Sequence, residues 1–336
     1  MKRILLSRTD SIGDVILTLP VAGVLKEMFP GCRIIFLGRD YTRDIVALSA
    51  HVDEFISWDA VSKMDGAEDK TAFLKNTGAD TILHIFPDKD IARLSKKAGI
   101  QTRIGTTGRF YHYLYCNKLV KFSRKRSTLH EAQLNLKLLR PLGWSKELKP
   151  EEIIPYYGLD NIPVLNEEFA ALPDPGKINL TLHPKSKGSA REWGLANFDQ
   201  LVKALDKSKY KLFVTGTKEE GRSVREYLSF DDVHCIDLTG KMSLEQLIAF
   251  IARTDSLVAA STGPLHIAAA LGKVAIGIYP PIKPMHPGRW APLGIKANYL
   301  VLPNKCNDCR HGGTCQCMLD IKPLNIIQKL EEYFGK

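Results

Sequence analysis

The sequence predicts an α/β protein built from two Rossmann-like domains. Short apolar runs alternate with helical patterns, and this order is typical of parallel, doubly wound sheets. The alternation stops in a proline-rich segment and then starts again. The length of 336 residues suits two domains of about 150 residues each. We therefore expect an N-terminal domain over residues 1–155, a linker over 156–177, a C-terminal domain over 178–318 and a final helix within 319–336.

In the first half, apolar runs at 3–8, 33–38 and 81–86 predict strands. A polar turn, TDSIGD, follows the first run. Residues 15–29, VILTLPVAGVLKEMF, repeat apolar side chains every three or four positions, which predicts one amphipathic helix. Pro30-Gly31 is expected to end that helix.

The second half repeats the pattern after the linker. Strands are predicted at 178–184, 210–216, 256–260 and 274–279, and helices at 198–205, 243–254, 263–272 and 326–334. In open α/β sheets, ligands bind outside the carboxyl ends of the strands. The polar residues that directly follow strands are therefore the candidates for function.

Composition favours a globular protein with anionic partners. Hydrophobic residues make up 44% of the chain, and the net charge is +10. Such a charge attracts nucleotides, phosphorylated substrates, nucleic acid or an acidic membrane surface without choosing among them. The longest apolar region, 267–282, is interrupted and too short to span a membrane. The N-terminus lacks the apolar core of a signal peptide, so we expect a cytoplasmic protein.

Gly13-Asp14 follows the first strand and opens a helix. One interpretation is that Asp14 stabilises the positive end of the helix dipole. The other is that its carboxylate acts as a general base at a ligand site. The sequence leaves both open.

Two turns in the second half have the composition of phosphate sites. LHPKSKGSAREWG places Lys185, Lys187 and Arg191 after a strand, with Ser186 among small residues that let backbone N–H groups approach an anion. Ser261, Thr262 and Gly263 lie where a strand meets a helix, and the N-terminus of a helix favours phosphate. His266 is either part of this site or a buried core histidine.

Two smaller features belong to the same half. Glu219 or Glu220 follows a strand and could accept hydrogen bonds from ribose hydroxyls. Lys241 and Met242 precede a helix for which Ser243 and Gln246 predict a capping box. Their loop is a candidate border for a nucleotide base.

Four cysteines crowd into twelve residues near the end of the chain: Cys306, Cys309, Cys315 and Cys317. Four thiolates suit zinc, but the spacing between the last two is tighter than in standard zinc sites. Disulfides are rare in the cytoplasm. Zinc binding, redox pairing and a plain structural role all stay open here.

Several stretches, in order along the chain, resemble glycosyltransferase family 9, the heptosyltransferases of lipopolysaccharide assembly. They are residues 8–37, 130–143 (HEAQLNLKLLRPLG), 182–198, 238–247 (LTGKMSLEQL), 261–272 (STGPLHIAAALG), 289–294 (RWAPLG) and 317–321 (CMLDI). The resemblance implies a GT-B fold, with two Rossmann-like domains facing a central cleft. The first would bind the acceptor and the second the nucleotide-sugar.

The resemblance also implies a reaction. Family members invert the anomeric centre and use ADP-heptose or a related donor, and their catalytic aspartate matches Asp14. Their donor-diphosphate contacts match the 185–191 turn and Ser261-Thr262-Gly263. Many members have aspartate where this chain has Ser261, and that aspartate contacts the sugar, so the donor sugar stays open. No Asp-x-Asp motif is suitably placed, so we expect no essential metal and no cofactor besides the nucleotide-sugar substrate.

The basic, aromatic stretch from Arg103 to Arg126 lies in the presumed acceptor half. With Gly13, the cations Arg124, Lys125 and Arg126 are candidates for binding an anionic glycolipid or glycan, or for touching the inner membrane where that lipid lies. The alternative is a solvated loop whose aromatic side chains pack inward.

Three other functions remain open from the sequence. A protein that binds nucleotide-sugars without transferring them is supported by Ser261. A nucleic-acid-binding module would use the basic stretch but leaves both phosphate turns unexplained. A GT-B enzyme of another kind, such as an epimerase, would need further acid and base residues. We expect no nucleic acid partner.

Overall fold

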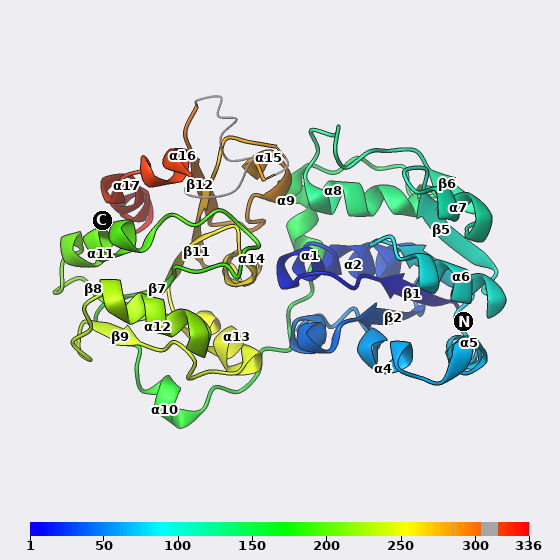
Figure 1. Ribbon diagram of the computed structural model, residues 1–336, viewed down its shortest axis with the longest axis horizontal. Helices are drawn as coiled ribbons and strands as arrows, with labels where there is room; N and C mark the ends of the chain where they lie inside the picture. The colour runs from blue at the N-terminus through cyan, green and yellow to red at the C-terminus, as the bar shows by residue number, and fades with distance from the viewer. Residues whose placement is uncertain (284, 304–314, 336) are drawn as a thin grey trace. The chain divides into compact units, whose positions relative to one another are not determined.

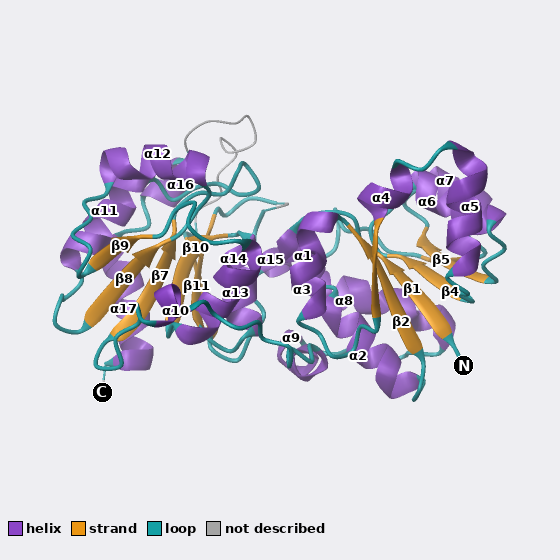
Figure 2. Cartoon of the chain, turned by 90° about the horizontal axis from the view of Figure 1, so that it is seen from below, coloured by secondary structure: helices purple, strands orange, loops and turns teal. Residues whose placement is uncertain are grey.

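The computed structural model describes residues 1–283, 285–303 and 315–335, and the chain in it divides into two compact units, Met1–Asn161 and Ile162–Lys336. The division falls inside the proline-rich segment. Each unit holds a parallel sheet with helices on both faces (Figures 1 and 2).

Unit 1 contains a sheet in the order β3-β2-β1-β4-β5-β6. Its strands are β1 (Arg3–Ser7), β2 (Arg33–Gly38), β3 (Glu54–Ser57), β4 (Thr81–His84), β5 (Thr102–Thr106) and β6 (Lys118–Val120). Its helices are α1 (Ile12–Ile16), α2 (Leu19–Met28), α3 (Arg43–Ala47), α4 (Trp58–Ser62), α5 (Gly66–Asn76), α6 (Lys89–Lys97), α7 (Phe110–Tyr115), α8 (Glu131–Leu136) and α9 (Pro150–Ile153).

Unit 2 contains a sheet in the order β12-β11-β10-β7-β8-β9. Its strands are β7 (Ile178–His183), β8 (Tyr210–Val214), β9 (Cys235–Asp237), β10 (Ser256–Ala260), β11 (Val274–Tyr279) and β12 (Ala297–Val301). Its helices are α10 (Glu167–Ala170), α11 (Leu195–Ala204), α12 (Lys218–Tyr227), α13 (Leu244–Arg253), α14 (Gly263–Ala270), α15 (Pro287–Trp290), α16 (Gln316–Leu319) and α17 (Pro323–Phe334).

The prediction of a single helix over residues 15–29 is wrong. The structure has two helices, α1 and α2, separated at Leu17 and Thr18. Pro20 lies in the first turn of α2, where its missing N–H and fixed φ angle favour a helix start over a helix interior. The break keeps α1 short, directly after β1.

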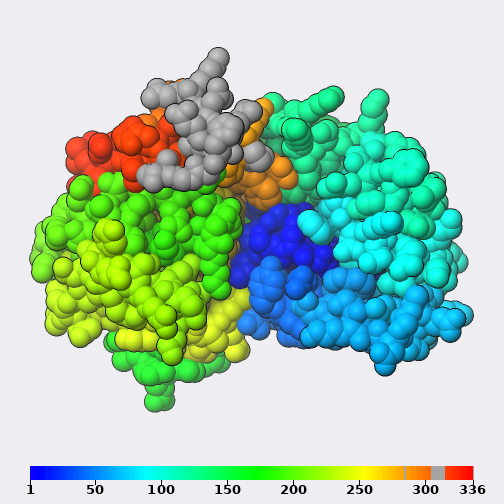
Figure 3. All heavy atoms as spheres, in the orientation of Figure 1, coloured from blue at the N-terminus to red at the C-terminus, as the bar shows by residue number. Residues whose placement is uncertain are grey.

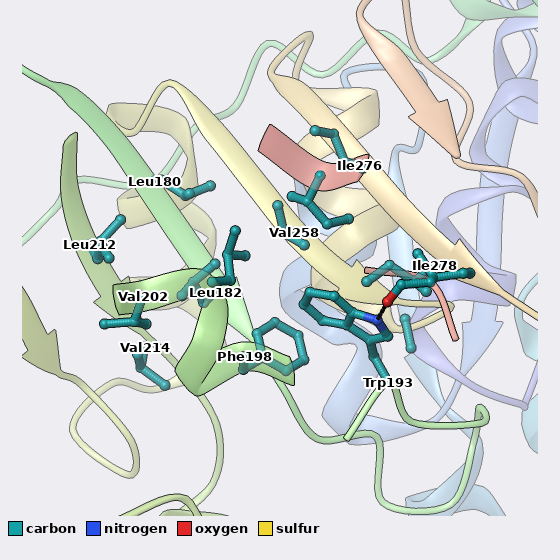
Figure 4. Packing of buried hydrophobic residues seen from close by; sticks show 14 of the residues in the cluster. Leu180, Leu182, Trp193, Phe198, Val202, Leu212, Val214, Val258, Ile276 and Ile278 are labelled. Atoms are coloured by element: carbon teal, nitrogen blue, oxygen red, sulfur yellow. Dashed lines mark hydrogen bonds between the residues drawn. The ribbon is translucent and has the colours of Figure 1, made fainter. Parts of the chain in front are cut away.

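Apolar side chains of the strands and helices form a separate core in each unit. In unit 1, Leu5, Ile35 and Ile82 from three neighbouring strands pack with α6. In unit 2, Leu180, Val258 and Ile276 pack with α11 and α17 (Figure 4). These cores fix the strands, and so the turns that leave their carboxyl ends. Across the residues described, no helix combines the length and apolar character needed to cross a membrane.

Candidate functional site

Asp14 lies at the topological switch point of unit 1. β2 pairs with one edge of β1, and β4 pairs with the opposite edge, so the strand order reverses at β1. Ligands of open α/β sheets bind beside such reversals, outside the carboxyl ends of the strands. The turn after β1 carries Asp14 in the first turn of α1.

The contacts of Asp14 do not resemble those of a helix cap. Its carboxylate accepts hydrogen bonds from the Arg8 guanidinium and from the Ser11 hydroxyl. No backbone N–H donates to this carboxylate among the described residues, and Ser11 holds the N-cap position without a side-chain capping bond. The Asp14 side chain is 18% exposed, so it is ordered by its neighbours yet accessible to a ligand.

A buried arginine holds this carboxylate in place. The guanidinium of Arg8 contacts Asp14, donates from Nε to Asp10 at 2.6 Å and from Nη1 to Glu131 at 3.2 Å. Burial opposes the charge of Arg8, but the three carboxylates outweigh it and raise the arginine pKa. Arg8 therefore stays charged and fixes three carboxylates around one point.

Asp10 is the second carboxylate at this point. Burial raises its pKa to about 7, opposed by the charge of Arg8 and reinforced by the charge of Asp14. A carboxyl whose pKa is shifted by burial and by neighbouring charges is common at catalytic centres.

The structure corrects the picture of Arg124 as one cation of a solvated stretch. Its side chain is 19% exposed, and Nε donates to the buried Glu131 at 2.9 Å. Its Nη2 donates to Asn135 and to the carbonyl of Ile85, each at 3.1 Å. Arg124 therefore belongs to the Arg8 network at the carboxyl ends of β1 and β4. Lys125 and Arg126 are exposed, and Gly13 is buried within α1.

Arg8, Asp10, Glu131 and Asn135 were not among the residues predicted to form a site. Arg8 and Asp10 lie in the same turn as Asp14, so the end of the first predicted strand was a signal for them. Glu131 is the second residue of the HEAQLNL stretch, but its burial and its bond to a residue 123 positions away are not visible in the sequence.

The two phosphate-like turns of unit 2 leave neighbouring strands. β7 and β10 pair in parallel, and the sheet order reverses between them, which makes this the switch point of unit 2. Residues 184–194 follow β7, and Ser261, Thr262 and Gly263 follow β10. Both turns therefore lie at the edge of the sheet where ligands bind.

The turn after β7 contains a carboxylate, Glu192, that was not among the predicted site residues. Lys185 donates to Glu192 at 2.6 Å, and the backbone N–H and hydroxyl of Ser186 donate to the other oxygen of Glu192 at 3.0 and 3.1 Å. The Glu192 carboxylate thus accepts hydrogen bonds from a lysine, a backbone N–H and a hydroxyl, the same kinds of donor that bind a phosphate. Lys187 is exposed, and it and Gly188 adopt positive φ angles of 49° and 79° at the tip of the turn.

Trp193 anchors the end of this turn in the core. Its indole is fully buried, and Nε1 donates to the carbonyl of Ile321 at 2.7 Å (Figure 4). The ring packs edge-on against Phe198, with centroids 4.9 Å apart. Arg191, two residues earlier, is half-buried. The core therefore fixes the base of the turn, and its tip stays in solvent.

The turn after β10 places a buried hydroxyl at the N-terminus of α14. Thr262 is the N-cap residue, but its side chain makes no capping bond. Its Oγ1 is buried and has no hydrogen-bond partner among the described residues. A buried polar atom without a partner is costly and calls for an explanation. The Thr262 side chain therefore does not cap α14.

The neighbours of Thr262 are arranged differently. Ser261 is half-buried near the buried Tyr279, whose hydroxyl donates to the carbonyl of Trp290. Gly263 begins α14, and His266 lies one turn inside it, only 3% exposed. His266 thus has the burial of a core histidine, although it lies on the helix that starts at this turn.

The remaining predicted residues follow the next two strands, β8 and β9. Glu219 is exposed in the first turn of α12, whereas Glu220 accepts from the N–H of Thr217 at 2.8 Å in a capping box. Glu219 is therefore the carboxylate left accessible. Lys241 is exposed and Met242 is half-buried. The predicted turns thus leave the adjacent strands β10, β7, β8 and β9.

The capping box predicted at Ser243 and Gln246 is only half present. The N–H of Gln246 donates to the hydroxyl of Ser243 at 3.2 Å. The Gln246 side chain instead bonds to the N–H of Asn166 and to the carbonyl of Val164. It therefore fastens the segment before α10 to α13.

Of the four cysteines in the zinc hypothesis, two belong to the described residues and two do not. Cys306 and Cys309 lie outside the described residues. Cys315 is disulfide-bonded, and Cys317 is buried. Within the described ranges, no cluster of three or more His, Cys, Asp or Glu side chains is arranged to hold a metal.

Comparison with known proteins supports the resemblance found in the sequence. The model of glycosyltransferase family 9 (heptosyltransferase) matches residues 73–318. A Haemophilus influenzae protein to which a glycosyltransferase function is ascribed is 28% identical over 308 residues, covering 87% of this chain and 86% of its own. Lipopolysaccharide heptosyltransferase 1 of Escherichia coli is 24% identical over 303 residues, covering 84% and 89%.

Solved structures agree in fold. The E. coli ADP-heptose lipopolysaccharide heptosyltransferase II aligns over 99% of this chain and 98% of its own, with a TM-score of 0.76 and 19% identity. E. coli heptosyltransferase WaaC with ADP aligns over 98% and 99%, with a TM-score of 0.72 and 17% identity. The α/β GT-B fold class is confirmed by this likeness.

Proposed function

Because this chain belongs to glycosyltransferase family 9, the heptosyltransferase family, we propose that it transfers a heptose or related sugar from a nucleoside-diphosphate donor. The acceptor is a lipopolysaccharide core or a similar anionic glycan. The observation that carries the proposal is the pair of phosphate-like turns at the switch point of unit 2, with the buried hydroxyl of Thr262 among them.

ADP-heptose is the donor that we place first. Two solved structures of one relative in fold, E. coli heptosyltransferase WaaC, contain ADP and ADP-2-deoxy-2-fluoro heptose. In this chain, the groups proposed to hold the diphosphate of the nucleotide-sugar by charge and hydrogen bonds are Lys185, Lys187, Arg191 and the N-terminus of α14 at Thr262 and Gly263. Glu219 is the candidate for accepting hydrogen bonds from the ribose. The other residues proposed to bind the nucleotide-sugar are Ser186, Lys241, Met242, Ser261 and His266.

In the proposed reaction, an acceptor hydroxyl attacks the anomeric carbon on the face opposite the nucleotide. A new carbon–oxygen bond forms, the bond to the diphosphate oxygen breaks, and the hydroxyl proton passes to the Asp14 carboxylate. The sugar carbon inverts through a transition state that resembles an oxocarbenium ion, as in glycoside hydrolysis. Negative charge develops on the leaving diphosphate, and the cations and backbone N–H groups of unit 2 stabilise it.

Arg124, Lys125 and Arg126 are the cations proposed for the acceptor, with Gly13 beside Asp14. Arg124 supports Glu131, so it acts partly through the Arg8 network, whereas Lys125 and Arg126 are exposed. The proposed setting is the cytoplasmic side of the inner membrane, where the donor is a nucleotide-sugar and the acceptor an anionic glycolipid. The proposal includes no nucleic acid partner and no required metal.

A second candidate function rests on Ser261. Because serine does not bring the charge of an aspartate to the sugar, a protein that binds a nucleotide-sugar without transferring it remains an alternative. Release of nucleoside diphosphate distinguishes the two functions. We expect release from ADP-heptose, or from another nucleotide-sugar in a panel of ADP, GDP and UDP donors, to depend on added acceptor. Saturable donor binding without acceptor-dependent release would favour the binding protein.

A further inference from the structure

Helix α7 presents large apolar side chains to solvent on one face. Phe110 is 80% exposed, Tyr113 is 58% exposed and Leu114 is 50% exposed. These residues are three and four positions apart, so they lie on the same side of the helix. The segment that contains α7, turquoise in Figure 3, forms part of the surface of unit 1. Single exposed apolar residues are ordinary, but three on one helix face are informative.

The opposite face of α7 is firmly anchored. His112 is fully buried, and the backbone N–H of Thr106 in β5 donates to its Nδ1 at 3.0 Å. The guanidinium of Arg103 donates from Nε to the carbonyl of Tyr115 at 2.7 Å, at the end of the helix. The exposed aromatic residues are therefore held outward by a fixed helix. One interpretation of the stretch 103–126 was that its aromatic side chains pack inward. Phe110 and Tyr113 do not.

Three cations lie close to α7 in the chain or contact its backbone. Arg109 directly precedes Phe110, Lys118 follows the helix by three residues, and Nζ of Lys96 bonds to the carbonyl of Leu114 at 2.9 Å. All three side chains are exposed and form no ion pair with the residues described. The acids at the start of α6 are engaged elsewhere. Asp88 caps that helix, and Asp90 pairs with Arg93.

We propose that the face formed by Phe110, Tyr113 and Leu114, together with the neighbouring cations Lys96, Arg109 and Lys118, docks on an anionic phospholipid surface. Aromatic side chains prefer the depth of lipid headgroups, and apolar residues on an interfacial helix enter the boundary with the acyl chains. Exposed cations add attraction to anionic headgroups that falls with salt. The docking requires no step of sugar transfer, so it stands or falls separately from the proposed reaction.

Vesicle flotation with the full chain tests this inference. The wild type is expected to bind vesicles of equal parts phosphatidylglycerol and phosphatidylcholine, and to bind pure phosphatidylcholine much more weakly. The double variant Phe110→Asn with Leu114→Asn is expected to weaken binding at least about tenfold, because two apolar side chains no longer leave water. Binding by the wild type is expected to fall as salt rises.

Val164→Asn is the matched control, because Val164 is an 87% exposed apolar residue of unit 2. This control is expected to bind vesicles like the wild type, and the thermal stability of both variants should be unchanged because the side chains are exposed. Wild-type protein that ignores anionic vesicles, or a double variant that binds them fully, overturns the inference. A dimer that the double variant abolishes would assign the face to a second copy instead. Donor-binding measurements on the double variant separate this outcome from failure of the proposed function.

Discussion

Asp14→Asn is expected to lower kcat at least about 100-fold, the lower range for loss of a general base. The amide keeps the size of the carboxylate but does not accept the proton of the attacking hydroxyl. Affinity for the nucleotide donor should barely change, because the proposed diphosphate donors all belong to unit 2. Acceptor-dependent release of nucleoside diphosphate gives kcat, and calorimetry gives the donor Kd.

Asp69→Asn serves as the control for this variant. Asp69 is an exposed carboxylate in the first turn of α5, a position similar to that of Asp14 in α1. The control should keep wild-type kcat. If Asp14→Asn also turned over at a near-normal rate, Asp14 would be reduced to an acid at a helix start with no chemical role.

Arg8→Met is expected to lower the free energy of unfolding of unit 1 by about 3–5 kcal/mol. Arg8 is 2% exposed, and loss of its guanidinium leaves the buried Glu131 paired with Arg124. Losing one partner of a buried ion pair is strongly destabilising, because the other charge stays away from water. Chemical denaturation followed by circular dichroism measures the change.

A double-mutant cycle distinguishes this cause from the loss of packing. Glu131→Gln removes the buried charge that Arg8→Met leaves behind, so the double variant should be less destabilised than the sum of the two single variants. Arg43→Met is a control, since Arg43 forms an exposed pair with Asp40 and such pairs contribute little. Strict additivity of the Arg8 and Glu131 effects would contradict the buried-charge account.

Much of the fold was predictable because local patterns and tertiary packing agree. The run Ser256–Ala260 is buried along its whole length and forms β10, and the helix expected over 263–272 forms α14 over 263–270. The turns after predicted strands were expected to lie along one edge of each sheet, because all parallel strands of a sheet end on the same edge. That rule located Asp14, the 185–191 turn and Thr262 at the switch points without knowledge of the strand order.

What the sequence did not predict depends on long-range partners. Arg8 and Glu131 meet across 123 positions, and nothing local indicates that Glu131 is fully buried. Gln246 satisfied a local capping pattern, yet its side chain bonds to Val164 and Asn166, about 80 residues earlier in the chain. The cations near Glu192 in the sequence predicted binding of an external anion, and the pairing of one of them with Glu192 itself was not predicted. In each case a tertiary contact decided between local alternatives.

The most direct test of the central claim is calorimetric titration of ADP, with GDP and UDP in parallel, into wild type, Lys185→Met, Thr262→Val and Lys203→Met. Lys203 is a 65% exposed lysine of α11 and is the control cation of the same unit. We predict that one nucleotide binds the wild type and the control equally. Lys185→Met and Thr262→Val should each weaken it about tenfold, since each removes a hydrogen bond to a charged group. Unchanged binding in both variants would contradict a diphosphate site at these turns.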